Sequence, residues 1–245
     1  ETEDCFLKVK NDYLKFLSKE KIFDQSRDAK IKSLKRTYIP MSFWIEKKYK
    51  KKGKTLFLGL SGGQGSGKTT TTGILKIILK KFFKREIQVS SIDNFYKTLK
   101  DRNLMSNKIH TLFKTRGVPG THDIKLLKKF FYHLKKINLK KFKSPKFDKS
   151  TDDRSKKRYW NNIRKKPEIV ILEGWCIGAK PQSKALIKKP INILEKYEDK
   201  NLLWRQYVNE RLKREYKSIF AKIDHFIFIK IPNFKMVFKW RLLQE

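Results

Sequence analysis

The stretch Gly62-Gly63-Gln64-Gly65-Ser66-Gly67-Lys68-Thr69 decides the fold of this chain of 245 residues. It satisfies the pattern G-x-x-x-x-G-K-[ST] in full, and it joins a short apolar run, residues 55–60, to a segment with helical periodicity, residues 68–83. Glycines let consecutive backbone N–H groups turn toward phosphate oxygens, and the helix that begins near Gly67 adds the positive end of its dipole. The pattern therefore predicts a strand, a phosphate-binding loop and a helix that together hold ATP or GTP.

Two side chains of this loop have chemical roles in nucleotide binding. Lys68 reaches the β- and γ-phosphates, and the hydroxyl of Thr69 ligates Mg²⁺. The alternative is a glycine-rich turn without a ligand, which the flanking strand and helix patterns disfavour. The predicted nucleotide contacts are Gly62, Gly63, Gln64, Gly65, Ser66, Gly67, Lys68, Thr69 and Thr70.

Two carboxylates follow predicted buried strands at residues 87–92 and 169–172. Asp93 ends the first strand on the side of the phosphate loop, where a carboxylate can accept the proton of an attacking hydroxyl during phosphoryl transfer. The alternative is that Asp93 caps a turn. Glu173 ends the second strand and has the form of a Walker B acid, which holds Mg²⁺ directly or through water. Its alternative is a charged residue that simply leaves a buried strand.

The strand and helix patterns alternate along most of the chain. This alternation predicts an α/β fold of three layers, the P-loop nucleotide-binding fold, with a mostly parallel sheet and helices on both faces. The further strand is predicted at 226–229 and the further helices at 121–137, 183–189 and 200–221. Polar, turn-rich segments at 97–120 and 140–160 are predicted to be irregular connections over the carboxyl ends of the strands, where ligands bind.

The first 54 residues are predicted to form a helical extension that packs on the phosphate-loop domain at 55–245. Residues 3–23 carry Phe6, Leu7, Leu14 and Leu17 at helical spacing, and residues 42–51 predict a second helix that Gly53 ends. The extension is therefore expected to cover part of the domain with an apolar stripe.

The net charge of +37 comes mainly from lysine, with 49 Lys against 12 Arg, spread from end to end. Because phosphate recognition favours the bidentate fork of arginine, we interpret most of this charge as a solvated surface. Weak, salt-sensitive binding of polyanions follows, without a specific nucleic-acid partner. A nucleic-acid-linked ATPase is the alternative that the charge leaves open.

The composition also indicates the cellular compartment of the protein. Cys5 and Cys176 supply neither a disulfide framework nor a metal cluster, and the longest apolar runs are too short to span a bilayer. The acidic start, Glu1-Thr2-Glu3-Asp4, lacks the order of a secretory signal. We therefore expect a cytoplasmic protein without a membrane partner, or an organellar one if a targeting segment was removed before Glu1.

Three further motifs complete a recognisable set. Residues 116–123 read Arg-Gly-Val-Pro-Gly-Thr-His-Asp, residues 145–150 read Pro-Lys-Phe-Asp-Lys-Ser, and residues 171–178 read Ile-Leu-Glu-Gly-Trp-Cys-Ile-Gly. With the phosphate loop and Asp93-Asn94-Phe95-Tyr96, they make the chain resemble the glycerate kinase family and its fungal ATP-binding relatives, within the phosphoribulokinase and uridine kinase group. The resemblance covers residues 55–245, and stretches at 192–195, 204–209 and 240–245 agree with it.

The resemblance implies phosphorylation of a hydroxyl of a small metabolite, D-glycerate first, with ATP and Mg²⁺ as cofactors. Lys68 and Thr69 fall on its nucleotide and Mg²⁺ positions, Glu173 near the metal, and Asp93 on the position of the presumed base. The segments that it implies for the acceptor pocket contain Tyr96, Arg116, His122, Asp148, Lys149 and Arg154. Arg116 and Lys149 suit a carboxylate or a transferred phosphoryl group, whereas His122 has a structural hydrogen-bonding role as its alternative.

Two departures from the family pattern qualify this expectation. Glycerate kinases usually carry a second aspartate where this chain has Asn94, and their chains continue into further helices where this one stops, at Glu245. The base at Asp93 is kept, while a nucleotide-binding protein without catalysis remains a further alternative.

Overall fold

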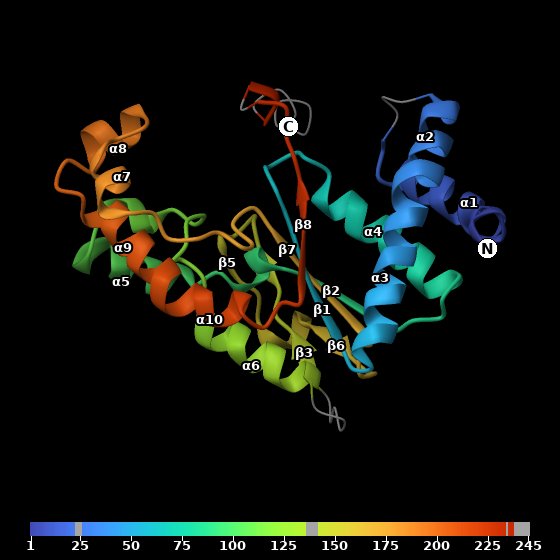
Figure 1. The fold of residues 1–245 in the computed structure, drawn as a ribbon. Coiled ribbons are helices and arrows are strands. Elements are labelled where there is room, and N and C mark those ends of the chain that lie inside the picture. Colours follow the sequence, from blue (N-terminus) through green and yellow to red (C-terminus); the bar gives the residue numbers. More distant parts are fainter. Residues whose placement is uncertain (23–25, 136–141, 234, 238–245) are drawn as a thin grey trace. The chain divides into compact units, whose positions relative to one another are not determined.

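A computed structural model describes residues 1–22, 26–135, 142–233 and 235–237 of the chain, which divides into two compact units (Figure 1). The first unit contains residues 1–90, 165–175 and the described residues after Ile223, and the second contains residues 91–164 and 176–223. The chain therefore leaves the first unit after each of two strands, β2 and β7, and returns to it. The sequence motif at 240–245 lies outside the described residues, as do the ends of the helices predicted at 3–23 and 121–137.

A four-stranded sheet forms the centre of the first unit, in the order β2-β7-β1-β8. The strands are β1 (Leu56–Gly62), β2 (Ile87–Ser91), β7 (Ile169–Gly174) and β8 (His225–Ile229). β1 pairs in parallel with both β7 and β8, although more than 100 residues of chain separate it from either strand. The predicted α/β fold with a parallel sheet is confirmed, and the apolar runs of β1 and β7 are those of strands buried on both faces. The apolar run of β8 is instead that of an edge strand, on which Phe226 and Phe228 are exposed.

Helices of the first unit cover one face of this sheet, and Figure 1 shows α3 and α4 alongside its strands. The helices are α1 (Thr2–Lys19), α2 (Arg27–Ser33), α3 (Ile39–Lys52) and α4 (Lys68–Lys81), with a π-helical turn, η1, at Leu34–Tyr38. Alternate residues of β1, Leu56, Leu58 and Leu60, are buried with Leu75 and Leu79 of α4. This packing fixes α4, and with it the loop that precedes the helix.

The N-terminal helices pack on α4. Val9, Tyr13 and Leu17 of α1 are buried in one cluster with Ile74 and Ile78, which confirms an amphipathic helix. Leu7, which is expected on its apolar stripe, is exposed instead. α3 ends at a left-handed glycine, Gly53, with φ 64°, as its sequence predicts. The division of the chain at residues 54 and 55 stays a prediction, since residues 1–54 belong to the first unit with the sheet.

The second unit consists of helices and two short antiparallel strand pairs. Its helices are α5 (Leu99–Lys108), α6 (Ile124–Lys135), α7 (Lys184–Lys188), α8 (Ile193–Glu198), α9 (Leu203–Arg211) and α10 (Lys217–Phe220). Its short 3-10 helices are η2 (Ile92–Phe95), η3 (Thr111–Lys114) and η4 (Lys157–Tyr159), and a π-helical turn, η5, covers Leu212–Tyr216. Its strands form two antiparallel pairs: β3 (Phe142–Ser144) with β6 (Asn161–Ile163), and, within the segment that joins them, the hairpin of β4 (Phe147–Asp148) with β5 (Asp153–Arg154).

Two expectations need correction here. The segment 97–120 contains the helix α5, which sequence periodicity missed because the helix has no apolar stripe and its one buried residue is Arg102. Thr98 caps this helix by accepting a hydrogen bond from the backbone N–H of Asp101. The single helix expected at 200–221 is divided by η5, whose wider turn buries Leu212 and Tyr216. Among the helices of the described ranges, none is long and apolar enough to cross a membrane.

Candidate active site

The phosphate loop connects β1 to α4 in the first unit and depends on its glycines. Gly65 and Gly67 adopt φ of 74° and 81°, in the left-handed region that other residues rarely adopt. At Gly62 a Cβ atom would lie 2.6 Å from Ser66 Oγ and 3.1 Å from Ile229 Cβ. The predicted loop is therefore built as the pattern requires, with its backbone drawn close to a neighbouring strand.

The polar groups of this loop suit a polyphosphate. Lys68 Nζ donates hydrogen bonds to the carbonyl oxygens of Gly62 and Gly63, at 2.9 and 2.7 Å, which holds the ammonium group against the loop. Ser66 Oγ is buried and has no hydrogen-bond partner among the described residues. An ammonium group, an unpartnered hydroxyl and the N-terminus of α4 thus lie on one short segment, so these residues fit the phosphates of a nucleotide.

Glu173 lies on the strand beside the one that leads into the loop. It is 7% exposed and stands opposite Leu60 in the parallel register of β7 and β1, two residues before Gly62. Ser61 Oγ donates to the carbonyl oxygen of Trp175 at 3.3 Å and ties the two strand ends together. The parallel register therefore places Glu173 near the start of the phosphate loop, and its role in holding Mg²⁺ stays a prediction.

Two oxygen donors near the loop are of the kind that binds Mg²⁺. No group of three or more His, Cys, Asp or Glu residues that could hold a metal ion occurs in the described ranges. Mg²⁺ commonly uses one or two protein oxygens and takes its other ligands from phosphate and water. The exposed hydroxyl of Thr69 and the carboxylate of Glu173 are oxygen donors of that kind, and Thr70 follows on the same helix turn.

Asp93 belongs to the second unit and lies in η2, directly after β2. The hydroxyl of Ser91 accepts a hydrogen bond from the backbone N–H of Asp93 at 3.3 Å, which fixes the turn. The carboxylate is about one-third exposed, and Lys149 Nζ lies 4.0 Å from its Oδ2. The predicted approach of Asp93 to Lys68 joins residues of different units and stays a prediction.

Tyr96 contacts Asp93 from within the second unit. Its ring is buried, and burial, the charge of Asp93 and a hydrogen bond to that carboxylate all raise the pKa of Tyr96 above its ordinary value of 10. The phenol of Tyr96 therefore stays protonated and remains a donor, with the carbonyl oxygen of Gly117 3.5 Å from its hydroxyl. Arg154 supports the same segment, because its Nη2 donates to the carbonyl oxygen of Tyr96 at 2.7 Å and to Asp123 at 3.2 Å.

His122 is fully buried behind Tyr96. The two rings stack with centroids 4.4 Å apart, and His122 Nδ1 lies 2.6 Å from the hydroxyl oxygen of Tyr216. Burial lowers the pKa of His122 to about 3, so the ring is neutral. These contacts are those of the structural alternative, and a role for His122 in binding the acceptor stays a prediction.

The β4–β5 hairpin carries two other predicted acceptor residues, Asp148 and Lys149. The backbone N–H of Phe147 donates to Asn94 Oδ1 at 3.3 Å, so the residue that departs from the family pattern anchors this hairpin next to Asp93. Asp148 accepts hydrogen bonds from the backbone and hydroxyl of Ser150, which lower the pKa of Asp148. Lys149 is 71% exposed at the tip of the turn and is therefore accessible to a ligand.

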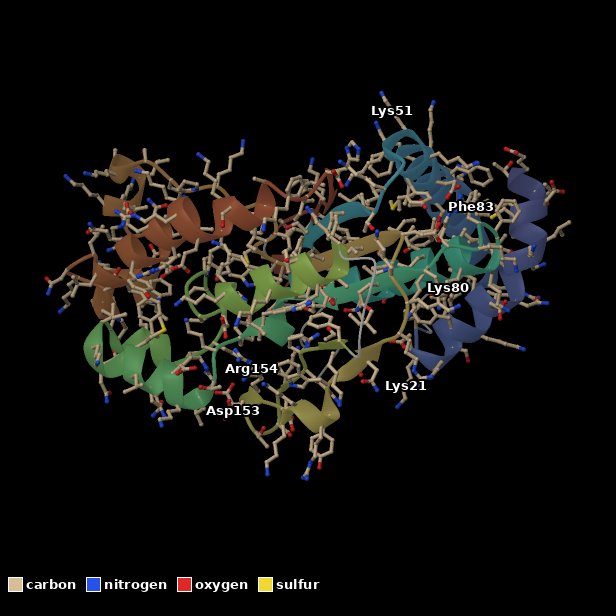
Figure 2. All side chains as sticks on the ribbon, turned by 90° about the horizontal axis from the view of Figure 1, so that it is seen from below. Lys21, Lys51, Lys80, Phe83, Asp153 and Arg154 are labelled. Carbon is tan, nitrogen blue, oxygen red and sulfur yellow. The ribbon has the colours of Figure 1, made fainter. Side chains whose placement is uncertain are left out.

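Arg116 completes the predicted set, and its surroundings contain residues that the sequence analysis did not single out. Its guanidinium group forms an ion pair with Asp152 and lies over the ring of Phe147, 5.5 Å from the centroid. Arg102, from α5, bonds the same aspartate. Figure 2 labels Asp153 and Arg154, which follow Asp152 on this hairpin. No local pattern marks these partners, because they come from separate segments.

The phosphoribulokinase / uridine kinase family model matches residues 57–188, which is more than half of the chain. The chain belongs to this family. It is therefore a kinase with a phosphate-binding loop, and membership implies that it uses ATP.

Individual relatives support membership of this kinase family. The chain is 32% identical over 211 residues to an uncharacterized kinase, mug58, of Schizosaccharomyces pombe, covering 82% of this chain and 74% of that one. It is 29% identical over 225 residues to the chloroplastic D-glycerate 3-kinase of Arabidopsis thaliana, covering 85% of this chain but 47% of that one, so it spans about half the length of the plant enzyme.

A solved structure supports the fold. The structure of D-glycerate 3-kinase from Cryptococcus neoformans superposes with a TM-score of 0.72 at 27% identity, covering 86% of this chain and 78% of that one. The resemblance to the kinase group that the motifs predict is thus confirmed.

Proposed function

We propose that the chain transfers the γ-phosphoryl group of MgATP to a hydroxyl of a small anionic metabolite, and that D-glycerate is this acceptor. The observation that carries the proposal is the gathering, in the second unit, of the partly exposed carboxylate of Asp93 with the cationic groups of Lys149 and Arg154 and the phenol of Tyr96. Two of the relatives are named as D-glycerate 3-kinases, which supports this choice of acceptor.

On the nucleotide side, the backbone of residues 62–67 and the ammonium group of Lys68 bind the phosphates. Thr69 and Glu173 would hold Mg²⁺, which would offset negative charge on the transferred group when bound. Lys68 exchanges its two carbonyl acceptors, Gly62 and Gly63, for phosphate oxygens, which are stronger acceptors for a charged donor.

On the acceptor side, Asp93 accepts the proton of the attacking hydroxyl. An oxygen–phosphorus bond forms between the acceptor and the γ-phosphorus, the bond from that phosphorus to the β,γ-bridging oxygen breaks, and ADP leaves. Tyr96 keeps Asp93 oriented through its hydrogen bond, while Arg116 and Lys149 bind the carboxylate of the acceptor.

The test is a coupled assay of ADP release with D-glycerate, pantothenate, uridine and glycerol as acceptors. We expect turnover with D-glycerate, and loss of turnover in Lys68→Ala with unchanged melting of the protein. Asp93→Asn should keep the stabilisation by MgATP and lose transfer, whereas Asp101→Asn, a substitution in an exposed helix cap of the same unit, should change neither.

Two results would contradict the proposal. Normal transfer by Lys68→Ala would remove the nucleotide assignment, and normal transfer by Asp93→Asn would place the base elsewhere. ATP hydrolysis that is stimulated by polynucleotide, without transfer to a small acceptor, would favour the nucleic-acid-linked alternative.

We propose the cytoplasm as the compartment of this activity.

A further inference from the structure

Asp152 lies between two arginines of the second unit. Arg102 Nη2 donates to Asp152 Oδ2 at 2.8 Å and also to the backbone carbonyl of Asp152. Arg116 Nη1 donates to the other carboxylate oxygen, Oδ1. The two guanidinium groups lower the pKa of Asp152 against the effect of its partial burial, so the carboxylate is charged. One aspartate thus binds both arginines, one on each oxygen.

Arg102 is the fixed side of this arrangement. Its side chain is fully buried, and its Nη1 donates to the carbonyl oxygen of Lys114 at 2.7 Å. A buried arginine that contacts carbonyl and carboxylate oxygens through both terminal nitrogens has little freedom to reorient. Asp152 is therefore bound by the guanidinium group of Arg102, which solvent does not reach.

Arg116 is the accessible side. Its side chain is 29% exposed, and one face of its guanidinium group is occupied by the ring of Phe147. A guanidinium group has five N–H donors in a rigid plane, and the contact with Asp152 uses one terminal nitrogen. In the described part of the chain, the structure assigns no other acceptor to Arg116. The opposite edge of the plane can therefore receive a carboxylate in bidentate geometry.

We infer that Asp152 is a positioning residue for the acceptor: it holds Arg116 by one edge, against the buried Arg102, so that the other edge of Arg116 binds the anionic group of the acceptor. This inference rests on the proposed function and deepens it, because it makes the negative charge of the acceptor, rather than its hydroxyl, the feature that Arg116 and Asp152 recognise.

Asparagine is the substitution that isolates this role. Asp152 adopts φ 51°, a left-handed conformation that Asp and Asn tolerate better than other side chains. Asp152→Asn therefore keeps the shape and the backbone of the turn, and it removes the charge and one of the two acceptor oxygens. Asp153→Asn is the matched control, since Asp153 Oδ1 accepts a hydrogen bond from the backbone N–H of Leu99 and contacts neither arginine.

The experiment compares KM and kcat for D-glycerate and for glycerol, which has the hydroxyls without the carboxylate, in the wild type, Asp152→Asn, Asp153→Asn and Arg116→Lys. For Asp152→Asn we expect KM for D-glycerate to rise about 10- to 100-fold, the range of one charge-assisted hydrogen bond, with KM for ATP and the turnover of glycerol unchanged. Arg116→Lys should show the same selective loss, and adding it to Asp152→Asn should cause little further loss.

Equal losses for D-glycerate and glycerol, or a KM for D-glycerate within twofold of the wild type, would overturn the inference while leaving the kinase activity established. If the wild type phosphorylates neither compound, the proposed function fails. The contact by which Asp152 holds Arg116 is then tested by arginine side-chain NMR, independently of turnover. Restricted rotation of the Arg116 guanidinium group in the wild type, released in Asp152→Asn, supports it, and equal rotation in both proteins overturns it.

Discussion

The buried His122 predicts a specific loss of stability in acid. The oxygen of Tyr216 accepts a hydrogen bond from the backbone N–H of Gly120 at 2.8 Å, so its own O–H donates to His122 Nδ1. His122 Nε2 is buried without a partner among the described residues. A second proton on this ring would put a charge into a closed cluster and would turn Nδ1 into a donor that faces the O–H of Tyr216. The folded protein therefore keeps His122 neutral.

The sign and size of the effect follow from the two pKa values. In the unfolded chain His122 binds a proton near its ordinary pKa of 6.5, whereas the folded pKa is about 3. Between these values the unfolded state binds more protons, so stability is complete above about pH 6.5 and falls as the pH falls. From pH 7 to pH 5 this group lowers the free energy of unfolding by about 2 kcal/mol, at about 1.4 kcal/mol per pH unit.

His122→Asn isolates this contribution, because the asparagine oxygen can accept the hydrogen bond of Tyr216 and its side chain does not titrate. Urea denaturation followed by tryptophan fluorescence at pH 7 and pH 5 measures the loss in both proteins. The wild type should lose about 2 kcal/mol more than the variant, since other titrating groups contribute equally to both. The same loss in the two proteins would refute the assignment of a neutral, buried histidine.

Three further predictions concern the first unit and the surface. Gly73→Val should lower the free energy of unfolding by about 3 kcal/mol in urea denaturation, because a Cβ atom there would lie 2.3 Å from Phe16 Cζ, where α1 packs on α4; a stability equal to the wild type would contradict this packing. Glu46→Gln should cost about 3 kcal/mol in the same assay, since Glu46 is 5% exposed and both of its oxygens accept from Arg85, at 2.5 and 2.9 Å; a change below the error of the assay would show that the pair is dispensable. Retention on heparin should fall steeply with added salt and be unchanged in Lys68→Ala, because the net charge of +37 is spread over the surface; retention that depends on Lys68 would point to a specific polyanion site instead.

The nucleotide side of the candidate site could be predicted almost entirely from the sequence. The glycine spacing before Lys68, the apolar run of β1 and the acid at the end of β7 are local signals, and each belongs to a short contiguous segment. These segments come together only if β1 pairs in parallel with β7, and the alternation of strands and helices predicts this pairing.

The acceptor side could be predicted only as a list of residues. Motifs named Arg116, Lys149 and Arg154, but they gave no account of how these side chains are held. α5 was not predicted, because a helix whose buried residue is an arginine has no apolar period to detect. Asn94 departs from the family pattern in the sequence, whereas its role as the anchor of the β4–β5 hairpin depends on the tertiary contact with Phe147.

The sequence by itself determined the parallel α/β architecture and the phosphate loop, because apolar periodicity and the demands of glycine backbone act within a few residues. Tertiary structure alone decided that Asp152 binds arginines 50 and 36 positions away, and that His122 meets a tyrosine 94 positions away. A hydrogen bond or an ion pair depends on where two side chains end in space, and no spacing along the chain encodes that for partners on different elements. The local signals therefore decide which elements form, while packing of those elements decides which charges face one another.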